Sequence, residues 1–240
     1  MTSSFYISSP TSRGVEPFLA YSYLAEVVYF IIAVTASLTQ LEELFLDTNE
    51  IRNLYPLENL TGLRRLHLMS NQIGDIAPLA NLTQLEELNL NATETSELYP
   101  LENLTGLRRL FLGANQIGDI APLTNLIQLE KLILNNNEVE DLTPLLELSS
   151  LEELGLNDNV INDVYVLSYL PDLRVLRLAR NLIPDFSPLS RLTDLRLLEL
   201  DTEYVDDGLC VLIKEINQTD RGGGLTILNE EGISNELICE

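Results

Sequence analysis

The side chains that could carry out chemistry in this sequence are few and far apart. The only histidine is His67, and general-base catalysis would need a nucleophile and an orienting carboxylate beside it. A closely similar stretch of sequence has Phe111 at the equivalent place, and no GxSxG elbow is present. Cys210 and Cys239 are the only cysteines and lack CxxC spacing. We therefore predict a non-enzyme without a cofactor, in which His67 is a surface residue.

Two further segments have residue types that bind ions or phosphates in other proteins. Asp201, Glu203, Asp206 and Asp207 supply enough oxygen atoms for a calcium ion, but they lack the DxDxDG spacing with a closing glutamate. We interpret this cluster as a solvated acidic end. The RGGG stretch at 221–224 lacks the lysine and hydroxyl residue of a phosphate-binding loop, so it predicts a turn.

The composition excludes some classes of partner. The chain has 240 residues, of which 45% are apolar, so it can bury a sizeable core. Its formal net charge of -23 repels nucleic-acid phosphates and anionic membranes and attracts a protein partner with a basic surface. We expect a monomer that binds no nucleic acid. Membrane attachment would require residues 18–36 to act as an anchor.

A repeat of 22 residues organises most of the chain. Eight units begin at Leu38 and at every twenty-second residue up to Leu192, and each carries the pattern LxxLxxLxL with leucine at all 32 positions. The last two leucines of a unit alternate with one outward residue, which is the period of a strand. A strand this short is stable only when neighbouring units stack at roughly 4.8 Å into a parallel sheet.

The remainder of each unit must lead the chain back to the next strand. Prolines recur there at 56, 78, 100, 122, 144 and 188, which indicates a 3₁₀ or irregular return path. Three residues after each strand leucine stands an asparagine whose inward amide can bond the backbone of adjacent turns; the set is Asn49, Asn71, Asn115, Asn137, Asn159 and Asn181. The third unit has Thr93 and Thr95 instead, so we expect local looseness at 93–95.

Residues 104–127 follow the pattern LxxLxxLxLxxNxIxDIxPLxxLT almost completely. This pattern resembles the 22-residue leucine-rich repeat of bacterial internalins and of the related intracellular regulatory subunit of protein phosphatase one. The resemblance implies an α/β fold: a right-handed solenoid shaped as a curved horseshoe, with a parallel sheet on the concave face and a 3₁₀ or irregular convex side. It also implies protein recognition by the concave face. No LPxTG wall-sorting signal is present, and the tail is too short for an internalin immunoglobulin-like domain, so host-cell invasion is not carried over from the resemblance.

We predict three parts: an N-terminal cap at 1–37, eight repeats at 38–203 and a C-terminal cap at 204–240. Residues 18–36 are almost wholly apolar and leave three interpretations open, namely a cap on the first repeat, a signal peptide and a membrane anchor. In the C-terminal cap, 206–217 predicts a helix and 225–233 a short strand. The compartment, cytoplasmic or secreted, depends on the role of 18–36.

The outward strand positions contain the candidate binding residues. Alternating glutamate and arginine at 43, 65, 87 and 109 predict ion pairs between neighbouring strands. Large apolar side chains on the same surface, beside arginines, are typical of interaction hot spots. The predicted partner-binding residues are Phe45, Arg65, His67, Met69, Arg109, Phe111, Lys131 and Ile133. A weaker second patch comprises Val160, Val175, Leu182, Leu197 and Tyr204.

The sequence thus favours a non-catalytic protein-interaction scaffold. Two alternatives remain open: a regulatory subunit of an enzyme such as a protein phosphatase, and a secreted internalin-like adhesin. The two repeats at 38–81 match those at 82–125 at 33 of 44 positions, which indicates duplication of a two-repeat block. Some residues therefore recur by descent as well as by function.

Overall fold

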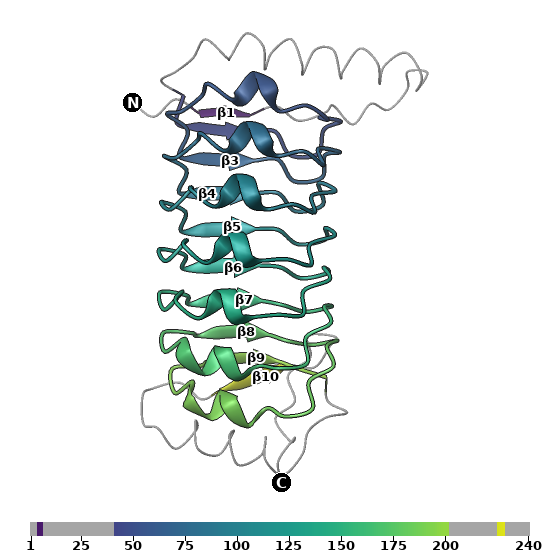
Figure 1. Cartoon of the computed structure of the whole chain (residues 1–240), viewed down its shortest axis with the longest axis vertical. Coiled ribbons are helices and arrows are strands. Elements are labelled where there is room, and N and C mark those ends of the chain that lie inside the picture. The colour runs from purple at the N-terminus through teal and green to yellow at the C-terminus, as the bar shows by residue number, and fades with distance from the viewer. Residues whose placement is uncertain (1–3, 7–40, 202–224, 229–240) are drawn as a thin grey trace. The chain divides into compact units, whose positions relative to one another are not determined.

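The computed structural model describes residues 4–6, 41–201 and 225–228 (Figure 1). Each of the eight repeats contributes one three-residue strand, β2 to β9, and one further strand lies at each end, β1 and β10. The strands are β1 (Ser4–Tyr6), β2 (Glu43–Phe45), β3 (Arg65–His67), β4 (Glu87–Asn89), β5 (Arg109–Phe111), β6 (Lys131–Ile133), β7 (Glu153–Gly155), β8 (Val175–Arg177), β9 (Leu197–Glu199) and β10 (Thr226–Leu228).

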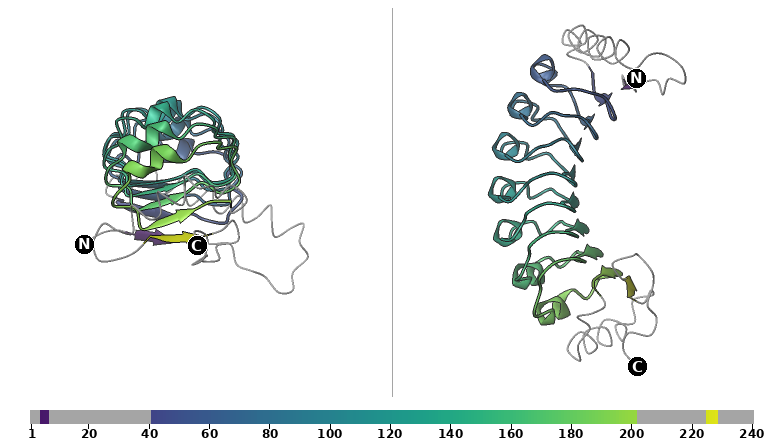
Figure 2. Two further views of the ribbon diagram at one scale, coloured as in Figure 1. Left: turned by 90° about the horizontal axis from the view of Figure 1, so that it is seen from below. Right: turned by 90° about the vertical axis from the view of Figure 1, so that its right-hand side faces the viewer.

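Short 3₁₀ helices form the return path, on the side of each repeat away from its strand (Figure 2). They are η1 (Tyr55–Leu57), η2 (Ala77–Leu79), η3 (Tyr99–Leu101), η4 (Ala121–Leu123), η5 (Thr143–Leu145), η6 (Tyr165–Tyr169) and η7 (Ser187–Arg191). All except η6 have proline in the first turn, where its fixed φ and missing N–H are compatible with the helix. The predicted 3₁₀ return path is confirmed.

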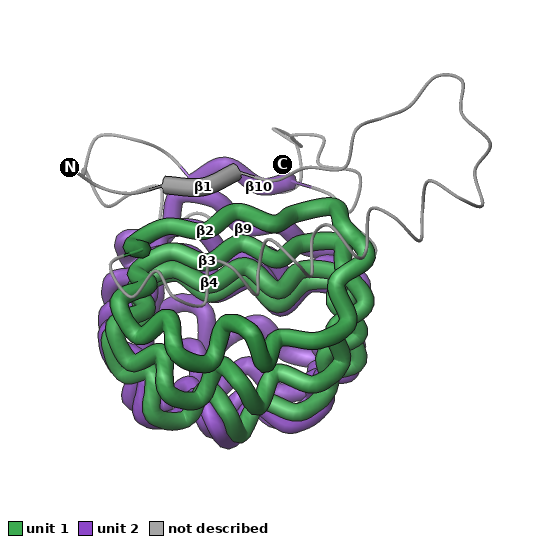
Figure 3. The backbone as a smooth tube through the Cα atoms, turned by 90° about the horizontal axis from the view of Figure 1, so that it is seen from above, with its two compact units in different colours: residues 1–116 green, residues 117–240 purple. Residues whose placement is uncertain are grey.

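The chain divides into two compact units, residues 1–116 and residues 117–240 (Figure 3). In the first unit β1 to β5 pair in parallel and in sequence order, with Leu44 opposite Leu66 and Leu66 opposite Leu88. In the second unit β6 to β10 pair in the same way. Each unit is therefore a stack of leucine-rich repeats, as the repeat pattern predicted.

The leucines of the repeat pattern form the core of each unit. Every one from Leu41 to Leu200 is buried. They alternate with outward residues along each strand, so equivalent leucines of successive repeats lie side by side in the register of the sheet. Burying one leucine stabilises the fold by roughly 1.5–3 kcal/mol.

The asparagine ladder connects consecutive repeats through the backbone. Asn159 donates from Nδ2 to the carbonyls of Leu134 and Leu156, both at 3.0 Å, and its Oδ1 accepts from the N–H of Val139 at 3.0 Å. Asn71, Asn115 and Asn181 make the equivalent contacts in their own repeats. The predicted structural role of these asparagines is confirmed.

The predicted looseness at 93–95 is wrong. Thr93 and Thr95 are buried, and their hydroxyl groups lie 2.9 Å apart. The Thr93 hydroxyl also donates to the carbonyl of Leu90 at 2.8 Å, which is the type of bond that an asparagine amide makes elsewhere. Asn115 of the next repeat accepts from the N–H of both threonines. The two threonines replace the usual asparagine and isoleucine with bonds to each other and to the Leu90 carbonyl.

A second set of polar side chains caps the 3₁₀ helices. The Oδ1 atom of Asp75 accepts from the N–H of Ala77 at 2.9 Å, at the start of η2. The same contact recurs at the start of η1, η4, η5, η6 and η7, from Asn53, Asp119, Asp141, Asp163 and Asp185. Such Asx contacts satisfy a backbone donor where a turn begins. The third repeat has Glu97 at this place.

The two ends of the repeat array show one unexpected strand and one expected strand. Ser4–Tyr6 pairs in parallel with β2, although nothing in the sequence predicted a strand there. At the other end β10 lies within the segment 225–233 where a strand was predicted, and it pairs with β9. Residues 18–36 and 206–217, together with Cys210 and Cys239, lie outside the described residues. In the part that the structure describes, no helix is long and apolar enough to span a bilayer.

Candidate interaction surface

We call the side of the strands opposite the leucine core the outer face. In the first unit its side chains come from β2 to β5 and from the residue two places after each strand: Glu43, Phe45, Asp47, Arg65, His67, Met69, Glu87, Asn89, Asn91, Arg109, Phe111 and Gly113. In the second unit they are Lys131, Ile133, Asn135, Glu153, Gly155, Asn157, Val175, Arg177, Ala179, Leu197, Glu199 and Asp201. Each of the eight predicted binding residues lies on the outer face of its own unit, six in the first unit and two in the second.

Glu87 is the centre of the charged network in the first unit. Its carboxylate accepts from Arg109 Nε at 2.9 Å and lies 2.7 Å from His67 Nε2. Burial alone would raise the pKa of Glu87, but the hydrogen bonds from Arg109 and His67 outweigh it and hold the pKa below the usual 4.5. Arg65 pairs with Glu43 on the preceding strand. The predicted pairing of glutamate with arginine across these strands is therefore confirmed.

The apolar side chains of this face are only partly accessible. The rings of Phe45 and His67 meet edge to face, with centroids 4.7 Å apart and an interplanar angle of 80°. Phe45, Met69, Phe111 and Ile133 are half-buried, because neighbouring strands bring outward side chains into contact with one another. His67 lies on the surface as predicted, but it is held between Phe45 and Glu87.

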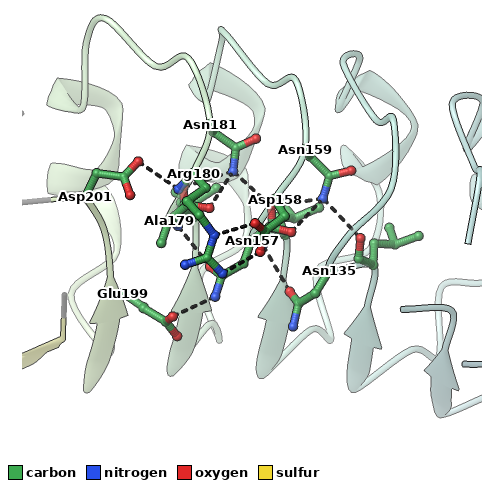
Figure 4. Close-up of polar contacts among 12 residues, drawn as sticks. Asn135, Asn157, Asp158, Asn159, Ala179, Arg180, Asn181, Glu199 and Asp201 are labelled. Atoms are coloured by element: carbon green, nitrogen blue, oxygen red, sulfur yellow. Dashed lines mark hydrogen bonds and ion pairs between the residues drawn. The ribbon is translucent and has the colours of Figure 1, made fainter. Parts of the chain in front are cut away.

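The second unit repeats the arrangement around Glu153. Its carboxylate pairs with Lys131 Nζ at 2.6 Å and with Arg177 Nη1 at 2.7 Å. Burial again opposes ionisation, and the bonds to Lys131 and Arg177 again lower the pKa of Glu153 below 4.5. Glu199 is buried and accepts from Asn157 Nδ2 at 2.6 Å (Figure 4). Arg177 Nε lies 3.4 Å from the other carboxylate oxygen of Glu199.

A further polar ladder runs along the outer face and was not predicted. The Oδ1 atom of Asn135 accepts from the N–H of Asn157 at 3.0 Å, and Asn157 in turn accepts from the N–H of Ala179 at 2.9 Å (Figure 4). Asp47 and Asn91 do the same toward Met69 and Gly113 in the first unit. The recurrence of Asp or Asn directly after the last strand leucine, as in Asp47, Asn91, Asn135 and Asn157, was the available signal.

Gly155 is the one glycine within the strands of the outer face. A Cβ atom there would lie 2.8 Å from Asn135 Oδ1 and 3.1 Å from Ile133 Cδ1. The side chains of Ile133 and Asn135 therefore lie over Gly155. The same Asn135 Oδ1 atom accepts from the N–H of Asn157, so a larger side chain at 155 would meet this bond.

The second predicted patch is divided by the structure. Val160 and Leu182 are exposed, whereas Val175 and Leu197 are half-buried on the outer face. Tyr204 lies outside the described residues. Other exposed apolar side chains lie on the return path, namely Tyr55, Tyr99, Ile127, Leu146, Tyr165 and Tyr169.

The acidic and histidine side chains of the described residues are not grouped as metal ligands. No group of three or more His, Cys, Asp or Glu side chains in this part is arranged to hold a metal ion. Asp201, the only described member of the acidic cluster, accepts from the N–H of Arg180 at 2.7 Å (Figure 4). Arg180 also forms a bidentate pair with Asp158, and these hydrogen bonds raise the pKa of Arg180.

Comparison with known proteins identifies the family to which this chain belongs. The family model described as Leucine Rich repeats (2 copies) matches residues 61–103 and 105–147. Internalin C2 of Listeria monocytogenes has a similar structure, with a TM-score of 0.68 and 39% sequence identity over 69% of this chain and 73% of that protein. The chain is an internalin-like leucine-rich repeat protein.

Two other solved structures share this fold. An internalin of Listeria monocytogenes, inlF, has a TM-score of 0.70 and 31% identity over 82% of this chain, which spans 64% of that protein. A leucine-rich repeat protein of Leptospira interrogans shares the fold, with a TM-score of 0.61 and 23% identity over 72% of this chain and 54% of that protein. No curated protein sequence is significantly similar. Leucine-rich repeat proteins are in general non-enzymatic scaffolds that bind protein partners.

Proposed function

We propose that this internalin-like protein binds a protein partner through the outer face of its repeats and does not act as an enzyme. The binding residues are the eight that the sequence indicated: Phe45, Arg65, His67, Met69, Arg109, Phe111, Lys131 and Ile133. The observation that supports the proposal is that half-buried apolar side chains and ion-paired arginines occur together on the outer face of the first unit. The Phe45 ring meets the His67 ring edge to face, and Met69, two residues after His67, donates its N–H to Asp47 Oδ1.

The side chains of this surface are held by their neighbours before a partner binds. The Phe45 ring is fixed by His67, His67 by Glu87, and Glu87 by Arg109, so little side-chain freedom is left to lose on binding. Aromatic and arginine side chains in such settings dominate the energy of many protein interfaces.

The test begins with chemical cross-linking in the cells that produce the protein, followed by purification of the partner. The dissociation constant of that partner is then measured for the double variant Phe45→Ser with Met69→Ser. Loss of a central hot spot weakens binding by roughly 30-fold or more. The thermal midpoint should stay within a few degrees of the parent, because neither side chain belongs to the leucine core.

Tyr55 and Tyr99 provide a matched control. Both are exposed aromatic residues at the same position of the return path, in η1 and η3. The double variant Tyr55→Ser with Tyr99→Ser should bind the partner as the parent does. If this variant loses the partner while the Phe45 and Met69 variant keeps it, the return path is the binding surface and the proposal is wrong.

A further inference from the structure

The ion pairs on the outer face of the first unit expose their two partners unequally. The side chain of Arg65 is 45% exposed, whereas that of its partner Glu43 is 10% exposed. The side chain of Arg109 is 44% exposed against 13% for Glu87. In both pairs the carboxylate lies deep between the strands and the guanidinium stands above it.

Ion pairs beside the outer face do not show this difference in exposure between the basic and the acidic side chain. Arg64 and Glu86, each directly before an outer-face residue, are 51% and 44% exposed. Arg174 and Glu152 occupy the same position in the second unit and are 49% and 48% exposed. The length of arginine therefore does not explain the inequality, which belongs to the outer-face position. In the second unit Lys131 and Arg177 are likewise more exposed than Glu153 and Glu199, by a smaller margin.

In these two pairs the more accessible partner is the cation, although the whole chain is acidic; the Asp47 side chain, 31% exposed, is the carboxylate of this face that remains accessible. Glu87 keeps its negative charge, because its pKa lies below the usual value, and it holds Arg109 in place. A molecule that touches the first unit at either of these pairs meets the guanidinium group before the carboxylate. Arg109 bonds Glu87 through Nε and Nη2, and a guanidinium has five N–H donors, so it has further donors to offer.

We propose that the outer face of the first unit recognises an acidic segment of a protein. Carboxylates of that segment accept hydrogen bonds from Arg65 and Arg109, and an apolar side chain packs against Phe45 and Met69. Arginine suits this role because its planar fork bonds carboxylates with two parallel hydrogen bonds. This inference rests on the proposed function and replaces the expectation of a basic partner, which considered only the net charge of -23.

The two partner classes are distinguished by the effect of salt. The net charge of the chain repels an acidic segment at long range and attracts a basic one. Raising the ionic strength from about 20 mM to about 150 mM screens the long-range term and leaves close contacts less affected. The association rate constant of an acidic partner therefore rises with salt, whereas that of a basic partner falls.

The test uses two synthetic peptides and the full chain. Both peptides have the same leucine and phenylalanine at the centre, flanked by glutamates in one and by lysines in the other. We expect the glutamate peptide to perturb backbone amide NMR signals of β3 to β5. The double variant Arg65→Gln with Arg109→Gln should weaken its binding by about tenfold or more.

The chain contains a close control for these variants. Arg64 and Arg108 directly precede Arg65 and Arg109, so Arg64→Gln with Arg108→Gln removes the same net charge from the flank of the same repeats. This control should change binding of the glutamate peptide less than about twofold. The inference is overturned if the lysine peptide perturbs β3 to β5 more strongly, or if the control weakens binding as much as the outer-face variant.

The natural partner separates this inference from the proposed function. Loss of binding by the Phe45 and Met69 variant together with loss by the Arg65 and Arg109 variant supports both. Loss by the Phe45 and Met69 variant alone means that the outer face binds the partner but does not recognise acidic groups. If neither variant loses binding, both proposals are wrong.

Discussion

At the scale of single residues, Asn159 shows how one amide ties a repeat to the one before it. Its Nδ2 and Oδ1 atoms satisfy two carbonyls and one N–H that the strand ends leave inside the fold. A leucine core alone could not do this, because buried backbone groups without partners are costly.

Replacing Asn159 by alanine should therefore destabilise the protein strongly. The change leaves the N–H of Val139 buried without its acceptor, and we expect a loss of about 1–3 kcal/mol in the free energy of unfolding. Urea unfolding followed by circular dichroism measures it. The variant Asn162→Ala is the control, because Asn162 is exposed and contacts only the Glu140 carboxylate among the described residues. Equal losses in the two variants would refute the structural role of the ladder.

Glu87 makes the stability depend on pH. A carboxyl whose pKa is lowered in the folded state releases its proton more readily there than in the unfolded chain. Its contribution is complete above about pH 4.5, the usual value, and is lost as the pH falls below this value through the folded pKa. Glu153 acts in the same direction.

We therefore expect Glu87→Gln to flatten the decline of stability with acid. The measurement is the urea midpoint between pH 3 and pH 7, with the difference between variant and parent largest at the upper end of this range. Glu147→Gln, at an exposed position, serves as the control. A difference between Glu87→Gln and the parent that grew toward acid pH would contradict the assigned direction.

At the scale of elements, the caps of the 3₁₀ helices can be tested by adding a missing cap and by removing an existing one. Asp75 caps η2, while Glu97 at the equivalent place of η3 makes no such contact among the described residues. Glu97→Asp should add the missing acceptor for the N–H of Tyr99 and stabilise the fold by roughly 0.5–1 kcal/mol. Asp75→Glu should have the opposite effect. Thermal unfolding of both variants measures this, and a loss of stability in Glu97→Asp would show that the cap is not what limits η3.

An element of this fold could be predicted from the sequence when the residues that form it recur at a fixed spacing. The strands, the 3₁₀ return path and the asparagine ladder follow from residues that recur every 22 positions. The compact pair Thr93 and Thr95 was predicted wrongly, because the pattern shows which residues are replaced but not that two hydroxyls can bond each other. Strand β1 carries no repeat motif, and its pairing with β2 depends on contacts distant in sequence.

The sequence predicted which residues lie on the outer face, but not how deeply each of them is buried. Alternating charges on neighbouring strands indicated the pairs of Glu43 with Arg65 and of Glu87 with Arg109. Which member of a pair lies deeper depends on the side chains on both adjacent strands, such as His67 beside Glu87. That information lies in three-dimensional packing and not in the spacing of any motif.

At the scale of the whole molecule, 37 acidic against 14 basic residues should make the folded chain sensitive to ionic strength. Raising sodium chloride from about 10 mM to about 150 mM shortens the screening length from about 30 Å to about 8 Å. This reduces self-repulsion of the compact state, while each exposed ion pair contributes less than about 1 kcal/mol. We expect the thermal midpoint to rise over this range in calorimetry. A fall would mean that the ion pairs outweigh the net charge.

The alternation of charges along β2 to β5 also limits which duplications of repeats keep opposite charges on neighbouring strands. A two-repeat block encodes one glutamate and one arginine at the same strand position, as Glu43 with Arg65 and Glu87 with Arg109 show. Unequal recombination that copies the whole block sets each new arginine next to glutamates, whereas copying a single repeat sets two like charges on adjacent strands. Residues 38–81 match residues 82–125 at 33 of 44 positions, as expected if the repeats were duplicated two at a time.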